Sequence, residues 1–318
     1  MSTGQTPRAL VVTKIPADLR SALNSEYELT DYPADAASVG PFPRTPGFAI
    51  AVTMVYSGAS AQLMDALPDL KLIASGGVGL DKIDLPEAAR RGIAVTHTPD
   101  ELTEDTSDAA VGLIFGVARR MVEADRFVRS GAWLNGHLSE SRRVSGRRVG
   151  IVGLGKIGRA IARKCSALGL PVFYTGPHRK SDVDYRFCDS VRALAESVDI
   201  LVLSCPGGAA TRHIVGAAEL AALGPDGILI NVSRGSVVDE AAVIEALTSK
   251  TIAGAGLDVF ASEPAIDPRF RVLENVVLQP HYAAITHEMR AATTERLCRE
   301  IRAFVRGEAF LNVAAARN

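Results

Sequence analysis

The sequence predicts an α/β protein built from two doubly wound, parallel-sheet domains. Short apolar runs alternate with helical patterns along the whole chain, which is typical of parallel strands joined by helices that cover both faces of a sheet. The chain has 318 residues, a length that suggests two domains. Its hydrophobic fraction of 47% is sufficient for two buried cores.

In the first third of the chain, short apolar runs predict strands at residues 9–13, 27–30, 49–55, 72–75 and 93–96. A short helix is expected between the last two strands. Asp84 can cap its start, Pro86 falls in its first turn and Gly92 follows its end. The stretch 40–47 is rich in proline and glycine and is a predicted loop.

A long helix is predicted to begin at Thr103, where Glu104, Asp105 and Asp108 lie near its positive end. Its apolar residues cover more than one face, which is typical of a helix buried on both sides. They are Ala109, Ala110, Val111, Leu113, Ile114, Phe115, Val117, Ala118, Met121 and Val122. Burial within one subunit would explain this pattern. We favour partial burial between two copies of the chain, and therefore expect a homodimer.

A second α/β unit begins at Val149, where an apolar strand runs into a Gly-x-Gly-x-x-Gly turn and then a helix. Gly153 makes the tight turn, Gly155 lets the backbone approach a pyrophosphate, and Gly158 lets the helix pack closely on the strand. The helix N-terminus offers free N–H groups and a positive dipole end to the phosphates. We therefore expect a dinucleotide site; a glycine-rich turn without a ligand is the alternative.

The second strand of this unit, residues 172–175, indicates which dinucleotide is bound. Sites for NAD usually carry an acidic residue about 20 residues after the glycine turn. No carboxylate lies between that turn and Asp182; Thr175 or the following glycine takes the acidic position, and Arg179 and Lys180 come soon after. A carboxylate would repel a 2′-phosphate, whereas an arginine fork would hold it. We therefore expect NADP(H) to be preferred, with NAD(H) possible. Alternatively, these two cations are ordinary solvated loop charges.

The other strands of the second unit are predicted at residues 150–153, 200–204, 228–232, 254–258 and 276–279. A final helix, from about residue 287 to 306, is expected to return to the first domain. The predicted domains are therefore a discontinuous substrate-binding domain, residues 1–99 and 285–318, and a dinucleotide-binding domain, residues 100–284.

Three residues that can carry chemistry follow predicted strand ends in the second unit: Arg234, Glu263 and His281. Ligands of open α/β sheets bind at the carboxyl ends of strands, so an arginine fork, an acid and an imidazole are expected beside a bound nicotinamide. Each residue alone has a structural explanation, as a solvated charge, a loop residue before proline or a hydrogen-bonded histidine. Their common placement favours a catalytic role.

Composition argues against other kinds of partner. The net charge of −1 gives no indication of nucleic acid or of an acidic membrane surface. No segment approaches the length of a membrane span. The four cysteines are scattered and form no C-x-x-C pair, which argues against a metal site or a disulfide framework. We therefore expect a cytoplasmic protein with no metal, nucleic-acid or membrane partner.

From residue 72 to 308, the chain resembles the D-isomer-specific 2-hydroxyacid dehydrogenases. The likeness is strongest in five segments that occur in the family's order: residues 77–81, 153–158, 231–235, 256–264 and 280–281. The resemblance implies a Rossmann dinucleotide-binding domain and a flavodoxin-like substrate domain. It also implies a small 2-oxo acid as substrate.

The same resemblance implies roles for individual residues. The match to Arg234 holds the substrate carboxylate and polarises the carbonyl, the match to His281 donates the proton, and the match to Glu263 pairs with it. Backbone N–H groups of Val78 and Gly79 match a loop that binds the substrate carboxylate. The expected cofactor contacts, in which the match to Asp258 holds the nicotinamide amide, are Gly153, Leu154, Gly155, Lys156, Ile157, Gly158, Thr175, Arg179, Lys180, Cys205, Pro206, Val232, Asp258 and Thr106.

Within the family, residues 174–176 look like those of the glyoxylate/hydroxypyruvate reductases, which prefer NADPH. The expected reaction is reduction of glyoxylate or hydroxypyruvate to the D-2-hydroxy acid by hydride transfer. Residues 282–286, Tyr-Ala-Ala-Ile-Thr, depart from the family pattern of a small aliphatic residue, Gly-Ser or Ala-Ser, and then threonine. The shape of the substrate pocket is therefore left open.

Four alternatives remain. The first two are a cofactor-sensing, corepressor-like binding protein and another 2-hydroxyacid dehydrogenase that uses NADH. The third is formate dehydrogenase, for which Gln279 before His281 is a partial match. The fourth is phosphoglycerate dehydrogenase, which often has a regulatory domain for which this chain leaves no room.

Overall fold

A computed structural model of the protein describes residues 7–33, 35–38 and 41–314. Contacts divide the chain into two compact units: the first comprises residues 1–102 and 286–318, and the second residues 103–285. Of the predicted loop 40–47, Gly40 lies outside the described residues, and residues 41–47 form neither helix nor strand. None of the helices in the described part of the chain has the length and hydropathy that a bilayer crossing requires.

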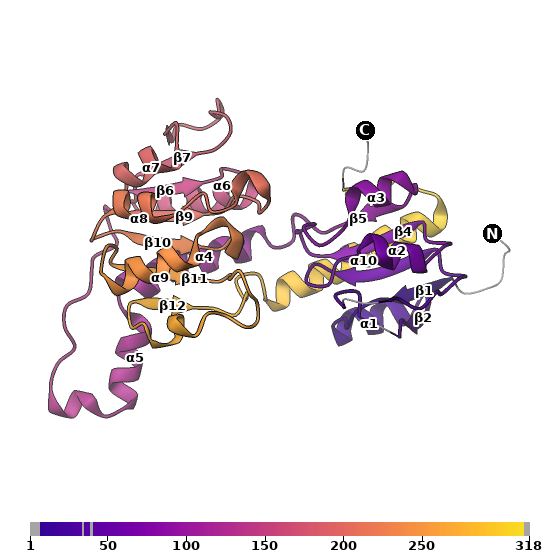
Figure 1. Ribbon diagram of the computed structural model, residues 1–318, viewed down its shortest axis with the longest axis horizontal. Helices are drawn as coiled ribbons and strands as arrows, with labels where there is room; N and C mark the ends of the chain where they lie inside the picture. Colours follow the sequence, from indigo (N-terminus) through magenta and orange to yellow (C-terminus); the bar gives the residue numbers. More distant parts are fainter. Residues whose placement is uncertain (1–6, 34, 39–40, 315–318) are drawn as a thin grey trace. The chain divides into compact units, whose positions relative to one another are not determined.

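The first unit contains a five-stranded parallel sheet in the order β2-β1-β3-β4-β5 (Figure 1). This is the flavodoxin-like order, as predicted. The strands are β1 (Arg8–Val11), β2 (Glu28–Asp31), β3 (Ile50–Met54), β4 (Leu72–Gly76) and β5 (Ala94–Thr96). The helices are α1 (Ala17–Asn24), α2 (Ala61–Ala66), α3 (Leu85–Arg90) and α10 (His287–Arg306).

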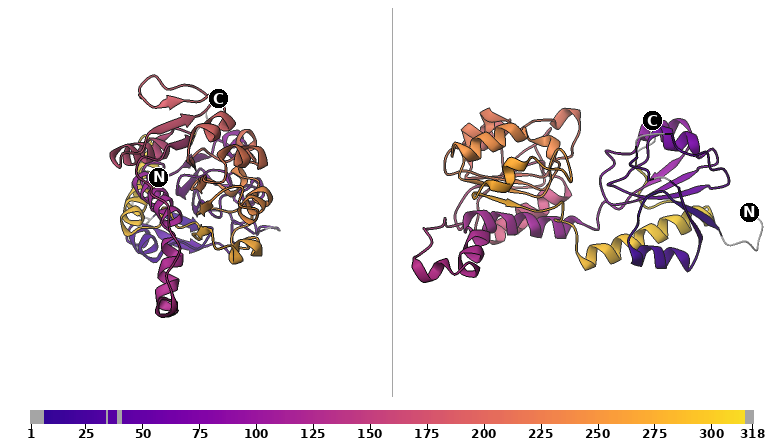
Figure 2. Two further views of the ribbon diagram at one scale, coloured as in Figure 1. Left: turned by 90° about the vertical axis from the view of Figure 1, so that its left-hand side faces the viewer. Right: turned by 60° about the horizontal axis from the view of Figure 1, so that its bottom comes forward.

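Two helices of this unit show how their residues determine where a helix starts and which face it buries. Helix α3 starts as predicted, because the Asp84 side chain accepts a hydrogen bond from the Glu87 N–H at 3.0 Å. The mostly polar helix α10 lies beside α1 (Figure 2) and buries one apolar stripe. Leu297 and Ile301 of that stripe are part of the core formed with β1, β3 and β4. The last helix therefore completes the core of the first sheet.

The second unit contains a seven-stranded parallel sheet in the order β12-β11-β10-β9-β6-β7-β8, with helices on both faces (Figure 1). This extends the Rossmann order by one strand and confirms the predicted fold class. The strands are β6 (Val149–Val152), β7 (Val172–Thr175), β8 (Arg186–Phe187), β9 (Ile200–Leu203), β10 (Ile228–Asn231), β11 (Gly254–Leu257) and β12 (Val276–Leu278). The helices are α4 (Thr103–Ala118), α5 (Met121–Arg129), α6 (Lys156–Ala167), α7 (Val191–Ser197), α8 (Ala217–Leu223) and α9 (Glu240–Thr248).

Burial explains which strands the sequence predicts. Strands β6, β9 and β10 are buried along their whole length, so each is a continuous apolar run rather than an alternating one. Strand β8, by contrast, is a partly exposed Arg-Phe pair at the sheet edge that carries no such run, and the sequence did not predict it. The observed strands also end one or two residues earlier than several of the predicted ones, because the residues that follow form the turns at the site.

The prediction of a long helix from Thr103 is correct for its start but wrong for its end. It ends at Ala118, Arg120 adopts a left-handed conformation with φ of 52°, and Met121 and Val122 belong to the separate helix α5. Helix α4 packs against α6, β10 and β11. Helix α5 and the 3₁₀ helix η1 (Ala132–Asn135) instead extend away from the sheet of their unit in every view (Figure 1, Figure 2).

Candidate active site

The glycine turn after β6 has the geometry that its sequence predicts. Gly153 has φ of +92°, and a Cβ added there would lie 2.7 Å from the Cα of Cys205 on the neighbouring β9 segment. A Cβ on Gly158 would lie 2.2 Å from the carbonyl oxygen of Gly153. Both positions therefore require glycine, one for the turn and one for the close packing of α6 on β6.

Gly155 differs, because a Cβ placed there would meet no atom within 4 Å. The glycine leaves open space beside the start of α6 at Lys156, where the helix presents its first N–H groups. Strand order reverses between β6 and β9, and this switch point is where ligands of such sheets bind. These features fit the pyrophosphate of a dinucleotide.

The other expected cofactor contacts differ in exposure. Leu154, Cys205 and Val232 are buried at strand ends, Thr106 is buried in α4, Ile157 is half-buried and Pro206 is exposed.

The segment after β7 is held by two contacts. The Lys180 N–H donates to the hydroxyl of the buried Tyr174 at 2.7 Å. Arg159 of α6 forms an ion pair with Asp182 at 2.9 Å, and this contact lowers the pKa of the Asp182 carboxyl. The side chain of Thr175 is buried, whereas Arg179 is exposed and directly precedes Lys180, the first of the two anchored residues. Arg179 is therefore carried on an anchored loop beside the end of β7.

The turn that carries Arg234 is organised by a residue that sequence reasoning missed. Asn231 is completely buried at the end of β10; its Oδ1 accepts the Ser233 N–H at 3.0 Å, and its Nδ2 donates to the Arg234 carbonyl at 3.1 Å. The next residue, Gly235, approaches another segment so closely that a Cβ would lie 1.9 Å from the carbonyl carbon of Phe260. A buried polar residue at a strand end was the available signal for Asn231.

His281 and Glu263 form the hydrogen-bonded pair that the family resemblance implied. His281 Nδ1 lies 2.8 Å from Glu263 Oε2, and the other carboxylate oxygen accepts the Phe260 N–H at 2.8 Å. Burial acts to raise the pKa of Glu263. The hydrogen bonds from His281 and Phe260, together with the charge of Arg234, outweigh it and hold that pKa below its usual value. Glu263 is therefore ionised at neutral pH.

Asp258 fixes the backbone around the histidine. Its carbonyl accepts the His281 N–H at 2.8 Å, and its Oδ1 accepts the N–H groups of Tyr282 at 2.6 Å and Ala283 at 3.0 Å. His281 itself has φ of 54°, an uncommon conformation for a residue with a side chain. Asp258 therefore accepts the N–H groups of three successive residues, and these contacts hold the backbone that carries the imidazole. Asp258 is only 2% exposed, and burial raises the pKa of its carboxyl in spite of the backbone hydrogen bonds.

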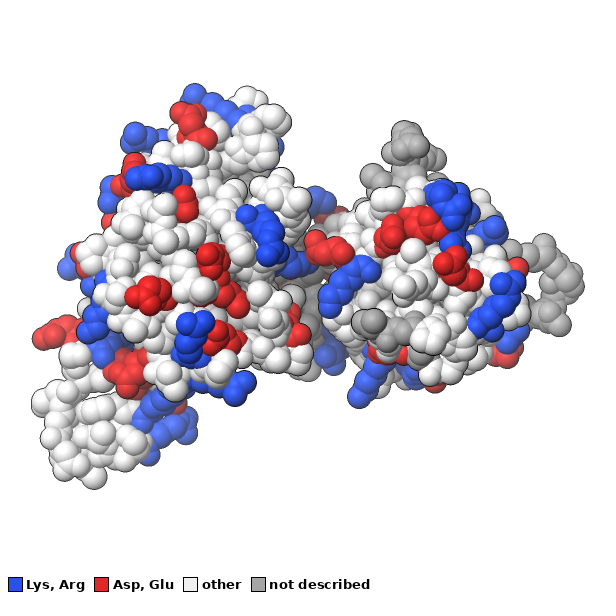
Figure 3. All heavy atoms as spheres, viewed as in Figure 1, with Lys and Arg blue, Asp and Glu red and all other residues white. Residues whose placement is uncertain are grey.

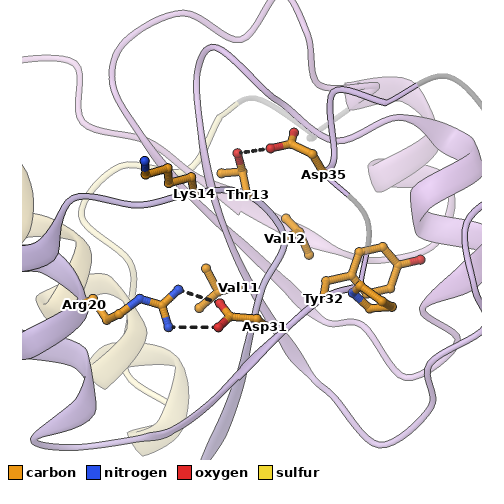
Figure 4. Close-up of a pocket in the computed structure, with 9 residues that line it drawn as sticks. Val11, Val12, Thr13, Lys14, Arg20, Asp31, Tyr32 and Asp35 are labelled. Atoms are coloured by element: carbon orange, nitrogen blue, oxygen red, sulfur yellow. Dashed lines mark hydrogen bonds and ion pairs between the residues drawn. The ribbon is translucent and has the colours of Figure 1, made fainter.

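In the first unit, Val78 and Gly79 lie in the loop that follows β4. A separate cavity of about 310 Å³ opens at the ends of β1 and β2 in the same unit (Figure 4). Its polar groups bind one another: Arg20 pairs with Asp31, and Thr13 Oγ1 donates to Asp35 at 3.0 Å. None of the predicted site residues lines this cavity.

The chain matches known proteins along most of its length. Residues 111–283 match the family described as D-isomer specific 2-hydroxyacid dehydrogenase, NAD binding domain. Glyoxylate/hydroxypyruvate reductase A of Arabidopsis thaliana is 46% identical over 255 residues, covering 80% of this chain and 82% of the relative. Hydroxyphenylpyruvate reductase of Plectranthus scutellarioides is 44% identical over 255 residues, covering the same shares. The NADPH-dependent glyoxylate/hydroxypyruvate reductase of Sinorhizobium meliloti, solved with NADP and malonate, has a TM-score of 0.90 and 38% identity, covering 98% of both chains.

The sheet order, the glycine turn at the switch point and the family match define an NAD(P)-dependent oxidoreductase. The chain belongs to the D-isomer specific 2-hydroxyacid dehydrogenase family, as its sequence motifs predicted. Enzymes of this family interconvert 2-oxo acids and 2-hydroxy acids with a nicotinamide cofactor.

Proposed function

We propose that this enzyme reduces a small 2-oxo acid, glyoxylate or hydroxypyruvate, to the D-2-hydroxy acid with NADPH. The hydrogen-bonded pair of His281 and Glu263, next to the Arg234 turn in the dinucleotide-binding unit, carries this proposal. An imidazole held by an ionised carboxylate is suited to proton donation. The printed names of two relatives, from Arabidopsis thaliana and Sinorhizobium meliloti, include both substrates.

Preference for NADPH is supported by the anchored loop after β7. The loop offers the exposed Arg179 and Lys180 and no carboxylate at the position where an acidic residue would bind a ribose hydroxyl. The Sinorhizobium meliloti relative is itself NADPH-dependent. NADH is the second coenzyme to test, because nothing in the glycine turn discriminates between the two dinucleotides.

The bound nicotinamide cofactor supplies the hydride. A carboxylate only accepts hydrogen bonds, so His281 Nδ1 carries its hydrogen toward Glu263 and Nε2 is left to protonate the substrate oxygen. Arg234 binds the substrate and stabilises the negative charge that develops on that oxygen. The N–H groups of Val78 and Gly79 bind the substrate carboxylate. Asp258 holds the backbone of His281 and would also contact the nicotinamide amide.

A panel of substrates tests this proposal. Glyoxylate, hydroxypyruvate, pyruvate and phenylpyruvate are each offered with NADPH and with NADH, and oxidation of the coenzyme is followed. We expect the highest kcat/KM for glyoxylate or hydroxypyruvate with NADPH. Binding of NADPH without turnover of any 2-oxo acid would favour the corepressor-like alternative.

One observation favours a second substrate class. After His281, the side chains of Tyr282 and Ile285 are 55% and 41% exposed, so the segment presents apolar surface in place of the usual small residues. An aromatic 2-oxo acid could pack against such surface. The relative from Plectranthus scutellarioides is named for hydroxyphenylpyruvate. A higher kcat/KM for phenylpyruvate than for glyoxylate would support this class.

We also assign substrate binding to the discontinuous domain, residues 1–99 and 285–318, and dinucleotide binding to residues 100–284. A homodimer is also proposed. Its interface would include α4, as the sequence suggested, and the α5–η1 segment that follows. Met121, Val128, Trp133 and Leu134 of that segment are each more than half exposed. The end of the segment is uncharged on the face drawn in Figure 3, whereas charges of both signs are interspersed elsewhere on that face.

The four cysteines are free and buried, which suits a reducing compartment, the cytoplasm.

A further inference from the structure

We propose that His97 and Thr98 are positioning residues for the backbone N–H groups of Val78 and Gly79. The inference rests on the proposed function, in which those two N–H groups bind the substrate carboxylate. Neither His97 nor Thr98 touches the substrate in this proposal. They act by fixing the direction in which the loop presents its N–H groups.

The sheet order of the first unit places the loop between two supports. Strand β4 lies between β3 and β5, so the loop that follows it is flanked by the residues that follow those strands. On the β3 side, Gly77 has φ of +115°, and a Cβ there would lie 2.4 Å from Cγ1 of Val55. Gly77 therefore packs directly against the Val55 side chain, which no other residue could do without displacing it.

On the β5 side, three hydrogen bonds hold the loop. The Gly77 N–H donates to Thr98 Oγ1 at 2.8 Å, and the Thr98 N–H donates back to the Gly77 carbonyl at 3.0 Å. His97 Nδ1 lies 3.2 Å from the Val78 carbonyl oxygen. A carbonyl oxygen only accepts, so Nδ1 must carry the hydrogen. Thr98 is 1% exposed, so its hydroxyl is protected from competition by water.

These contacts decide where the next N–H groups point. A trans peptide is planar, and its C=O and N–H groups point in opposite directions. Because the carbonyls of Gly77 and Val78 both bind the residues after β5, the N–H groups of Val78 and Gly79 point away from that strand. Among the described residues, none accepts a hydrogen bond from either N–H group. Successive free N–H groups on one side of a loop are suited to an anion.

The effect should appear in substrate binding rather than in chemistry. The carboxylate of a 2-oxo acid keeps its charge through hydride transfer, so its contacts stabilise ground state and transition state alike. Losing one supporting hydrogen bond should raise KM by roughly three- to tenfold and leave kcat nearly unchanged.

Matched variants separate this role from a general structural one. His97→Leu removes the donor, whereas His97→Asn can place an amide N–H where Nδ1 lies. Thr98→Val removes the hydroxyl, and Thr98→Ser keeps it. Thr96→Val is the control, because Thr96 is equally buried on the same segment but its hydroxyl has no hydrogen-bond partner among the described residues.

For each variant, KM and kcat are measured with the best 2-oxo acid. The dissociation constant of oxalate, a non-reacting dicarboxylate probe, is measured with NADPH present. We expect His97→Leu and Thr98→Val to weaken oxalate and raise KM by the same factor, and the other three variants to match the native enzyme. Affinity for NADPH and the melting temperature are recorded for all.

Unchanged oxalate affinity in both His97→Leu and Thr98→Val would overturn the inference, and so would equal weakening in Thr96→Val or a native enzyme that binds no oxalate. If Thr98→Val fails to fold, His97→Leu and His97→Asn decide alone. If the native enzyme binds oxalate with the expected pattern across the variants but reduces no 2-oxo acid, the proposed function fails and the positioning role stands.

Discussion

His281 Nδ1 lies 2.8 Å from Oε2 of Glu263, and the backbone of His281 is held by Asp258 in a left-handed conformation. The side-chain contact determines which ring nitrogen faces the substrate. The backbone contact determines the position of the Cα atom from which the imidazole extends. Loss of the imidazole should therefore remove the proton donor without moving the surrounding turn.

We predict that His281→Ala lowers kcat by about 10²–10⁴-fold, the usual contribution of a general acid. The dissociation constant of NADPH should stay close to that of the native enzyme, because the imidazole acts on the substrate oxygen. Steady-state kinetics with glyoxylate and a fluorescence titration with NADPH test the two parts. Near-normal kcat would mean that the acid is another residue, with Tyr282 or His287 the next to substitute.

The pH dependence should follow the charge of Glu263. Its pKa lies below the ordinary value of 4.5, so at neutral pH the carboxylate is ionised and places a negative charge beside the proton donor. In Glu263→Gln this negative charge is absent. The upper pH limit of reduction should therefore move to lower pH. Profiles of kcat/KM against pH for the two proteins measure the shift; coincident upper limits would contradict it.

Arg234→Ala should both raise KM and lower kcat, because the guanidinium binds the substrate and stabilises the developing negative charge. Arg234→Lys should recover only part of the loss, since a single ammonium cannot form two parallel hydrogen bonds. Asn231 holds the turn through backbone groups at residues 233 and 234, so the turn should persist in both variants. Steady-state kinetics measures the effects, and full recovery in Arg234→Lys would argue against a bidentate contact.

Arg179→Ala should weaken NADPH by roughly ten- to a hundredfold, the effect of losing a charge-assisted contact to a phosphate. NADH, which lacks the 2′-phosphate, should be nearly unaffected. Arg192→Ala is a suitable control, because Arg192 is also exposed in this unit and pairs with Glu196 at 3.3 Å. Dissociation constants of both coenzymes test the prediction. A native enzyme with higher kcat/KM for NADH would refute the preference itself.

The native protein should sediment as a dimer at micromolar concentration. A stable interface of this kind commonly buries about 2,000 Å² or more in total. Substituting Trp133 and Leu134 together by serine should shift the protein toward the monomer, since these side chains are 62% and 91% exposed in the single chain. Sedimentation velocity measures the change. A native monomer would refute the proposal, and an unchanged dimer in the variant would place the interface elsewhere.

The sequence predicted those features that depend on a residue's own chemistry and immediate neighbours. The glycine turn is one, because Gly158 packs against the carbonyl group of Gly153, which is only a few residues away in the chain. Asp84 as a helix cap is another. The pairing of Glu263 with His281 came from the family resemblance, because the two are 18 residues apart and only the fold brings them together.

Other features depend on which strands are neighbours. His97 can reach Val78 because β5 lies next to β4, and the alternation of apolar runs does not specify that order. The end of α4 was missed because Arg119 and Arg120 are ordinary helix formers. The left-handed turn at Arg120 instead accompanies contacts with Glu123 and with the backbone of residues 139 and 140, which only the folded chain provides.

Helix α10 has a consequence for biosynthesis. The core of the first sheet includes Leu297 and Ile301, which the ribosome adds after the whole second unit has been made. The second unit is one continuous segment and can therefore fold as soon as it emerges. The sheet made first must wait with part of its apolar face uncovered until α10 arrives. During translation, it is the amino-terminal part of this enzyme that most needs protection by chaperones.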